Sequence, residues 1–395
     1  MTEVEKDDLV VQERDSSNFT DRLRLIKEHD NIDIKFGYQK YTESTYVNAW
    51  LVNVEPSEIL DAPTKTVLSA TDFYFIAENG SRLKISYPFR PYLYLGTIPG
   101  TEFQVASYLN KKYPIAHVEH VEKENLDLKN HLSGLKSKFL FVSFPSTVEM
   151  AAFKKEITPQ IKKNQQNLKT SNDYTAMLAQ HLGVAKTFSD GEANEQIIDI
   201  REHDLPYHMR VCIDEKIFVG LWYKISGCDP SNQKPKITRN FDLIDAPDPV
   251  VCAFDIETTK LPLKFPDSSI DQIMMISYMI DGRGYLIINR EIISADIDDF
   301  EYTPRPEYKG EFKVFNEKDE KQLLKKFFAH LLKVKPHVMV TYNGDFFDWP
   351  FVEARAEFHG LKMYDEIGFY KDSQDEYKHI NSIHMDAFRW VQRDS

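Results

Sequence analysis

Residues 250–259 read VVCAFDIETT, an apolar run that ends in two acids separated by one isoleucine. The apolar composition of Val250–Ile256 predicts a buried strand. Residues two apart on a strand point to the same face, so Asp255 and Glu257 converge while Ile256 turns into the core. Two neighbouring carboxylates repel each other unless a cation lies between them. The stretch therefore predicts a divalent-metal site, and its oxygen ligands suit Mg²⁺ or Mn²⁺.

The chain after this strand continues with a regular series of elements. We expect strands over Ile273–Ile280, Tyr285–Asn289 and His337–Tyr342, and helices over Glu317–Val334 and Trp349–His359. The first helix has apolar residues at helical spacing. The second has Pro350 in its first turn and Gly360 just past its end. Three strands, a helix, a strand and a helix form the order of an RNase H-like nuclease core, so this part is predicted to be an α/β domain.

Residues 341–348 read TYNGDFFD and join the last of these strands to the second helix. Asp348 stands at the helix N-terminus, where free N–H groups stabilise an anion and orient its oxygens. A simple N-cap is the alternative interpretation, and a bare D-I-E pattern arises often by chance. Because Asp255 and Glu257 lie on the first strand of the same domain, we interpret Asp348 as the third ligand.

The amino-terminal part has a different composition of elements, and Ala246-Pro247-Asp248-Pro249 separates it from the nuclease-like part. We expect three segments: a disordered tail over 1–18, an α+β domain over 19–249, and an incomplete RNase H-like domain over 250–395. Within the α+β domain we expect helices over Phe19–His29, Glu102–Tyr113 and Thr147–Ile157, the second with Phe103, Ala106, Leu109 and Tyr113 on one face. The dipeptide Asn79-Gly80 predicts the turn of a hairpin. Strands are expected over Tyr46–Val54, Asp72–Ala77, Leu83–Tyr87, Pro91–Leu95, Phe139–Phe144, Ile197–Ile200, Tyr207–Ile213 and Ile217–Tyr223.

Composition limits the class of protein. Hydrophobic residues make up 42% of the 395 residues, which is enough for packed cores in two or three domains. Cys212, Cys228 and Cys252 form no C-x-x-C pair, so neither a zinc site nor a disulfide framework is predicted, and a reducing compartment is expected. We find no signal peptide and no membrane span. The net charge of −13 argues against coating nucleic acid through bulk charge, and Lys154–Lys169 is interpreted as a solvated face.

Three stretches are nearly identical, residue by residue, to motifs of a known protein family. They read FDIETTKLPLKFPD (Phe254–Asp267), DQIMMISYMIDG (Asp271–Gly282) and VTYNGDFFDWPFVEARA (Val340–Ala356). They are similar to the first two exonuclease motifs of family B DNA polymerases, most closely those of the epsilon catalytic subunits. Upstream, Tyr74–Ile76, Arg90–Tyr92, Asp199–Glu202 and Pro206–His208 match the same subunits more loosely. The resemblance covers nearly the whole chain beyond the tail.

The resemblance implies a 3′→5′ proofreading exonuclease that uses two metal ions, in a nuclear enzyme of leading-strand DNA replication. Asp255 and Glu257 would hold the metal pair, and Asp348 would join through the second metal. The implied DNA-binding residues are Asn343 and Phe347 at the primer terminus, Thr258 and Thr259 at the strand end, and Pro266 in the loop beside the single-stranded path. A core phenylalanine and an ordinary loop proline are the alternatives for Phe347 and Pro266. The implied partners are primer–template DNA, a single-stranded 3′ end and the other subunits of the holoenzyme.

Two parts of the family pattern are missing. The third exonuclease motif has a Tyr four residues before an Asp, but Gly368, Gln374 and Asn381 stand four residues after the tyrosines that follow Asp348. Asp386 is interpreted as a structural residue of a later strand. No D-T-D polymerase motif occurs, so we expect a fragment that cannot polymerise and is a weak nuclease or none. Zinc and a 4Fe–4S cluster are expected only in the missing part of the full-length protein.

Two other functions remain open. The chain could be a non-catalytic DNA- or partner-binding module with an incomplete nuclease fold, although its clustered carboxylates argue against this. It could also be a self-contained RNase H-like exonuclease of another family, which the long extension before Val250 disfavours.

Overall fold

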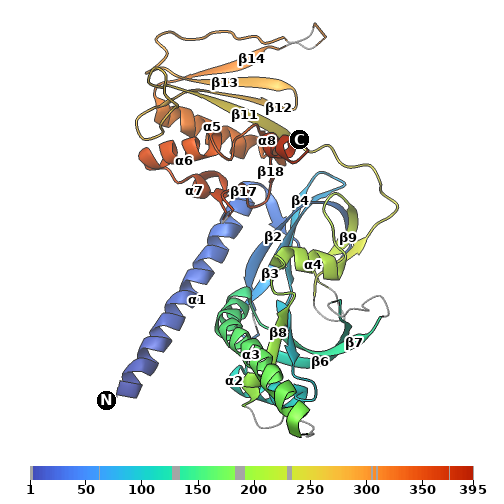
Figure 1. Cartoon of the computed structure of the whole chain (residues 1–395). Coiled ribbons are helices and arrows are strands. Elements are labelled where there is room, and N and C mark those ends of the chain that lie inside the picture. Colours follow the sequence, from blue (N-terminus) through green and yellow to red (C-terminus); the bar gives the residue numbers. More distant parts are fainter. Residues whose placement is uncertain are drawn as a thin grey trace. The chain divides into compact units, whose positions relative to one another are not determined.

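The computed structural model describes residues 3–61, 63–126, 134–182, 192–228, 234–303, 306–307, 310–372 and 374–394 (Figure 1). By its internal contacts the chain divides into two compact units. Unit 1 comprises 1–22, 56–71 and 87–217, and unit 2 comprises 23–55, 72–86 and 218–395. The division does not follow the proline-rich boundary at 246–249, because unit 2 also takes in segments from the amino-terminal part of the chain.

Unit 1 contains a four-stranded antiparallel sheet in the order β6-β7-β5-β8. Its strands are β5 (Tyr92–Thr97), β6 (His117–Glu124), β7 (Lys136–Ser143) and β8 (Ile197–Arg201), and its helices are α2 (Glu102–Lys112), α3 (Thr147–Leu182), the 3₁₀ helix η2 (Ala193–Gln196) and α4 (Tyr207–Glu215). Leu95, Leu109, Leu140 and Phe153 belong to the shared hydrophobic core. This is the small α+β module that the sequence predicted.

Unit 2 contains most of a six-stranded sheet in the order β1-β4-β3-β2-β9-β10. The strands are β1 (Tyr38–Lys40), β2 (Val47–Leu60), β3 (Val67–Ala77), β4 (Arg82–Pro88), β9 (Trp222–Ser226) and β10 (Lys236–Arg239), and α1 (Glu3–Lys35) precedes them. Gly80 has a φ of +80° between the neighbouring strands β3 and β4, which confirms the predicted Asn79-Gly80 hairpin. Gly80 supplies the positive φ of this turn, and Asn79 has a negative φ.

The second sheet of unit 2 has the order β14-β13-β12-β11-β15-β18. Its strands are β11 (Val251–Thr258), β12 (Ile273–Ile280), β13 (Arg283–Asn289), β14 (Phe312–Glu317), β15 (Val338–Thr341) and β18 (Ile383–Asp386). Strands β11, β12 and β13 pair antiparallel, whereas β15 and β18 run parallel to β11 on its other side. This arrangement confirms the predicted RNase H-like fold.

Two helices cover one face of this sheet, α5 (Glu320–Val334) and α6 (Asp348–Phe358) (Figure 1). Leu323, Leu324, Phe327 and Phe328 of α5 are buried in one core with Trp349 of α6. The remaining elements are α7 (Met363–Ile367), β16 (Phe369–Lys371), β17 (Tyr377–His379) and α8 (Ala387–Asp394). The apolar stripe predicted for Glu317–Val334 is therefore the stripe that packs under the sheet.

A buried charge cluster joins segments of unit 2 that are far apart in sequence. The ammonium of Lys84 lies 2.5 Å from Asp33 Oδ2 and 3.3 Å from Asp72 Oδ2. Asn381, just after β17, donates from Nδ2 to Asp33 Oδ1 at 3.0 Å. Tyr38 donates to the carbonyl oxygen of Asn381 at 3.4 Å. The end of α1 and strand β1 are thus hydrogen-bonded to the last part of the RNase H-like fold.

Several sequence predictions differ from the structure. Helix α1 already begins at Glu3, although 1–18 was predicted to be a disordered tail; the stretch contains no glycine or proline to interrupt a helix. Tyr207–Ile213 is helix α4 rather than a strand, since its alternating apolar residues include Met209 and Ile213, which are exposed. Within Ile217–Tyr223, β9 starts only at Trp222.

Helix α2 has the predicted position but a shifted buried face. Phe103 was predicted on that face and is 78% exposed, while Glu102 and Val105 are buried with Ala106 and Leu109. A phenylalanine at the edge of an apolar stripe can fall on either side of it, because 3.6 residues per turn leave the stripe's limits open. Among the described helices, none combines the length and the apolar composition that crossing a bilayer requires.

Candidate metal site

Strand β11 presents two acidic side chains on one face. Ile256 is buried, with 3% of its surface exposed, whereas Asp255 and Glu257 on either side of it are exposed. Asp255 pairs with Ser277 and Glu257 with Met275 of β12, and the register shifts directly after Glu257. The alternation of a strand therefore places both carboxylates on the face opposite the buried Ile256, as the sequence predicted.

Asp348 is the first residue of helix α6 and is buried, with 2% exposed. Its Oδ1 accepts the backbone N–H of Ile256 at 3.1 Å, which connects the helix to the middle of the acidic strand. The capping position belongs to Phe347, whose side chain accepts no hydrogen bond. A plain N-cap role for Asp348 therefore does not describe this helix.

The carboxyl groups of Asp348 and Asp255 are close enough to influence each other's charge. Burial raises the pKa of Asp348 to about 7, and the negative charge and hydrogen bond of Asp255 add to that rise. A carboxyl group whose pKa is raised in this way keeps its proton near neutral pH unless a cation takes the place of that proton. A divalent cation would replace that proton, so the pair fits a metal.

The loop between β15 and α6 brings Asn343 and Phe347 beside Asp348. Asn343 has a φ of +65°, and its carbonyl oxygen accepts the N–H groups of Phe346 and Phe347 at 3.2 and 3.1 Å. A Cβ on Gly344 would lie 2.4 Å from Thr341 Oγ1, so this turn excludes larger residues. Phe347 is half-buried and packs against the sheet core, and both interpretations of it remain predictions.

Thr258, Thr259 and Pro266 lie at or after the end of β11. The hydroxyl of Thr259 donates to Asp271 Oδ1 at 3.1 Å and accepts the N–H of Gln272 at 3.0 Å. It therefore fixes the loop to the start of β12 and keeps one acceptor position for another partner. Pro266 is half-buried in this loop. The DNA contacts implied for these residues remain predictions.

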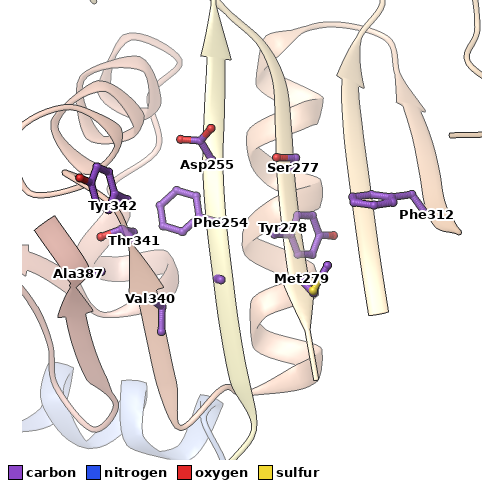
Figure 2. A pocket seen from close by; sticks show the side chains of 11 residues that line it. Phe254, Asp255, Ser277, Tyr278, Met279, Phe312, Val340, Thr341, Tyr342 and Ala387 are labelled. Carbon is purple, nitrogen blue, oxygen red and sulfur yellow. The ribbon is translucent and has the colours of Figure 1, made fainter. Parts of the chain in front are cut away.

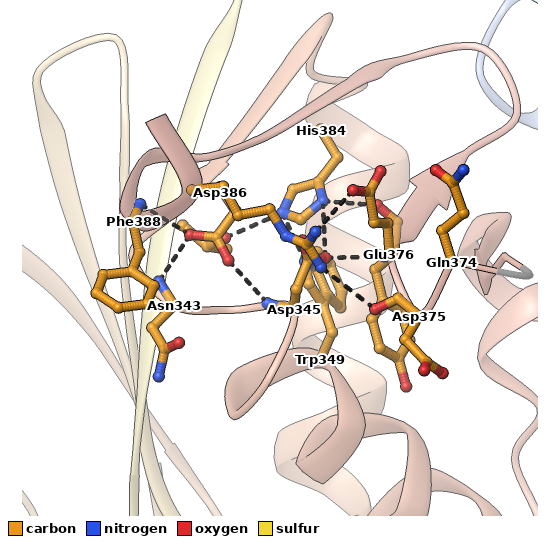
Figure 3. A network of polar contacts seen from close by, with 12 residues as sticks. Asn343, Asp345, Trp349, Gln374, Asp375, Glu376, His384, Asp386 and Phe388 are labelled. Atoms are coloured by element: carbon orange, nitrogen blue, oxygen red, sulfur yellow. Dashed lines mark hydrogen bonds and ion pairs between the residues drawn. The ribbon is translucent and has the colours of Figure 1, made fainter. Parts of the chain in front are cut away.

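A polar network surrounds the loop between β15 and α6, and the sequence analysis did not predict it (Figure 3). Asp345 Oδ1 accepts the N–H of Tyr377 at 2.8 Å, and its Oδ2 lies 2.5 Å from Arg389 Nε in an ion pair. His384 Nε2 lies 3.1 Å from Trp349 Nε1 and 3.0 Å from Thr341 Oγ1. Asp386 ends β18 and accepts backbone N–H groups, so it is the structural residue that was predicted. The two members of each of these contacts lie more than thirty positions apart, so no short-range pattern links them.

A pocket of about 490 Å³ lies on the sheet face that α5 and α6 leave open (Figure 2). Asp255 and Ser277 contribute polar atoms, and Ala253, Met279 and Val340 contribute apolar surface. Tyr342, at the start of the β15–α6 loop, also lines the pocket and is 62% exposed. The carboxylate of Asp255 is therefore accessible from this side.

The spacing of the candidate ligands bears on the number of metal ions. Among the described residues, the one group of three or more whose ligand atoms lie within 4.8 Å of one another is His29, Asp33 and Asp72. That group adjoins Lys84, whose ammonium already supplies a cation. Asp255, Glu257 and Asp348 are spread more widely. The ions of a two-metal site lie about 3.5–4 Å apart, so its ligands need not all reach the same ion.

Comparisons with known proteins agree with this fold. The family model for the exonuclease domain of DNA polymerase family B matches residues 198–395. The chain is 45% identical over 380 residues to the DNA polymerase epsilon catalytic subunit of Schizosaccharomyces pombe, covering 95% of this chain and 17% of that protein. The corresponding protein of Arabidopsis thaliana is 43% identical over 369 residues, covering 93% of this chain and 17% of the relative.

A solved structure is similar in fold. The family B DNA polymerase from the archaeon Pyrobaculum calidifontis superposes with a TM-score of 0.57 at 18% identity, over 87% of this chain and 37% of that one. Of the two epsilon catalytic subunits named above, the chain spans under a fifth of the length. From the family match and the identity to these relatives, the chain belongs to DNA polymerase family B and carries sequence of its exonuclease domain.

Proposed function

We propose that this chain is the amino-terminal part of the catalytic subunit of an epsilon-type replicative DNA polymerase, and that its unit 2 carries a 3′→5′ proofreading exonuclease site. The substrate would be the single-stranded 3′ end of a DNA primer. The observation that carries the proposal is the contact between Asp348 and the acidic strand, through the N–H of Ile256 and the carboxyl group of Asp255. Similarity to proteins named as polymerase epsilon supports the choice of substrate.

The acidic residues would hold the metal ions. Asp255 and Glu257 leave the same strand face, and Asp348 reaches it from the helix N-terminus. Bound there, a pair of Mg²⁺ or Mn²⁺ ions would supply an activated water and would stabilise the departing 3′ oxygen. Carboxylate oxygens suit either ion.

The neighbouring residues would bind the DNA strand. Asn343 lies in the loop that leads into Asp348, where its amide can position the primer terminus. Phe347 would pack beside the terminal nucleotide, and Thr258 and Thr259 would hydrogen-bond the strand end. Pro266 would border the single-stranded path. In the intact enzyme these residues would act together with other holoenzyme subunits, in the nucleus.

The fourth carboxylate of the family is missing from residues 1–395, because no Tyr-x-x-x-Asp follows Asp348. Ligands of a two-metal site act as a unit, so losing one removes most of the activity. We therefore infer that these 395 residues alone bind metal but cleave DNA slowly, and that they do not polymerise.

Mn²⁺ titration and a cleavage assay on a 3′-labelled single strand test this function. We expect the wild-type chain to bind Mn²⁺ and Asp255→Ala to lose that binding. Asp298→Ala, which removes an exposed carboxylate of the same unit, is the matched control and should bind as wild type does. Equal Mn²⁺ binding by wild type and Asp255→Ala would contradict the metal site. DNA binding without any Mn²⁺ site would instead favour a non-catalytic DNA-binding module.

A further inference from the structure

The loop that carries Asn343 and ends at Asp348 starts beside the end of another strand. Strands β15 and β18 run parallel, and Thr341 pairs with Asp386 at their last register position. The chain then leaves β15 through Tyr342 and Asn343, while Asp386 remains at the sheet edge with 7% of its surface exposed. A carboxylate is therefore buried directly under the first turn of the loop.

Both oxygens of Asp386 accept backbone N–H groups. Oδ1 accepts from Asn343 at 2.7 Å and from Phe388 at 3.0 Å, and Oδ2 accepts from Asp345 at 3.1 Å (Figure 3). Hydrogen bonds to an ionised acceptor are stronger than those between neutral groups. The side chain thus holds two loop residues that are two positions apart in sequence.

The loop turns at Asn343, whose φ of +65° lies in the left-handed region that asparagine adopts more readily than other residues with a side chain. Hydrogen bonds to its backbone groups determine whether this conformation persists. Here the N–H of Asn343 is bonded to Asp386, and its carbonyl oxygen is bonded to the N–H groups of Phe346 and Phe347. Residue 348 follows directly after this turn.

We propose that Asp386 is a positioning residue for the metal site: by fixing the backbone of Asn343 and Asp345 it sets the place of the Asp348 carboxylate relative to Asp255. This inference rests on the proposed function. Asp386 reaches the site only through the loop. Mutating a residue that holds a metal ligand in place without binding the metal itself lowers metal affinity by about 10–100-fold.

Asp386→Asn tests the proposal, because asparagine has the same shape but only one accepting oxygen. Its NH₂ group would face a backbone N–H, so the bond to Asn343 or the bond to Asp345 is lost. We expect Mn²⁺ binding to weaken roughly tenfold, and amide hydrogen exchange to accelerate at Asn343 and Asp345 but not in β11 or β12.

Glu320→Gln is the control for a general loss of stability. Glu320 is 1% exposed and binds Arg355, His359 and the N–H of Ile273, so it supports the same core without touching the loop. Measured at a temperature where each variant is folded, Glu320→Gln should leave Mn²⁺ affinity within about twofold of wild type.

Three results would overturn the proposal. The first is wild-type affinity for Mn²⁺ in Asp386→Asn, and the second is an equal loss in Glu320→Gln. The third needs no variant: unprotected amides at Asn343 and Asp345 in the wild-type chain would show that Asp386 does not hold them. Absence of Asp255-dependent Mn²⁺ binding in wild type would remove the proposed function and this inference with it, whereas the first two results leave the proposed function intact.

Discussion

Asp348 Oδ1 accepts the backbone N–H of Ile256 at 3.1 Å, which joins the first residue of α6 to the residue between Asp255 and Glu257. A side chain from a helix N-terminus is thereby held at the middle of a strand 92 positions earlier. The bond uses one oxygen of the carboxyl group, and the neighbouring Asp255 raises the pKa of that group. Metal binding at this place should therefore change the protonation state of Asp348.

Metal affinity should depend on pH through Asp348. Burial and the neighbouring Asp255 raise the pKa of Asp348 to about 7, and the proton must leave before a cation binds. Mn²⁺ binding should therefore be roughly tenfold weaker at pH 6 than on its plateau above pH 8. Calorimetric titrations in buffers of different ionisation enthalpy would show proton release near pH 6. A flat affinity between pH 6 and pH 8 would contradict this interpretation of the pair.

His384 should remain neutral when the solution is mildly acidic. Trp349 Nε1–H can only donate, so His384 Nε2 must accept, and the ring proton resides on Nδ1, which donates to the carbonyl oxygen of Tyr377 at 2.7 Å. Burial lowers the pKa of His384. In the unfolded chain this histidine binds a second proton below its ordinary pKa of about 6.5, whereas in the folded chain it does so only at lower pH. The free energy of unfolding therefore falls as the pH drops below about 6.5. Nitrogen chemical shifts of a ¹⁵N-histidine sample at pH 6 would reveal the tautomer; an imidazolium signal for His384 would refute the prediction.

Glu320 should be among the most sensitive charged residues of the RNase H-like core. Its carboxylate lies 2.6 Å from Arg355 Nη2, and both side chains are almost completely buried. Glu320→Ala would leave a buried guanidinium without its partner, which costs about 3–5 kcal/mol. Hydrogen exchange of α5 and α6 measures the loss. Glu317→Ala removes a partly exposed ion pair with Lys326 at 3.7 Å and should cost at most about 1 kcal/mol. Equal losses of stability in Glu320→Ala and Glu317→Ala would contradict the burial of the Glu320–Arg355 pair.

Gly344→Ala should damage the metal site without unfolding unit 2. The added Cβ would meet Thr341 Oγ1 at 2.4 Å and Thr341 Cβ at 2.5 Å, so the loop must move away from β15. Overpacking of this kind costs about 1–3 kcal/mol, and the displaced Asp348 should bind Mn²⁺ more weakly. Gly360→Ala is the control for a general loss of stability: nothing lies within 4 Å of its added Cβ, but a φ of +73° strains alanine at the end of α6, away from the loop, and Mn²⁺ affinity should stay at the wild-type value. Unchanged Mn²⁺ affinity in Gly344→Ala would show that the loop adapts.

The sequence predicted β11, β12, β13 and β15 of the RNase H-like sheet, because their apolar runs are continuous and local, but it did not predict β14 (Phe312–Glu317), whose run FKVFNE includes polar residues. The predicted bounds Ile273–Ile280 coincide with β12, and the two-residue repeat correctly placed Asp255 and Glu257 on one face. The alternating pattern of Tyr207–Ile213 was wrong because periodicity alone did not separate a half-exposed helix from a strand.

The supporting network was out of reach of sequence reasoning for a different reason. Asp345, His384 and Arg389 meet only after β18 has been placed beside β15, and no local spacing encodes that pairing. Asp386 was recognised as structural, but which backbone groups it holds follows from the fold alone.

The cluster around Lys84 limits where this polypeptide can be divided. A piece starting at Val250 would lack Asp33 and Tyr38, and the amide and carbonyl of Asn381, which is fully buried, would lose both partners. His379 would also lose its edge contact with the ring of Phe36. The nuclease fold therefore depends on residues more than two hundred positions upstream of its first strand, and excision at the prolines would yield an incomplete folding unit.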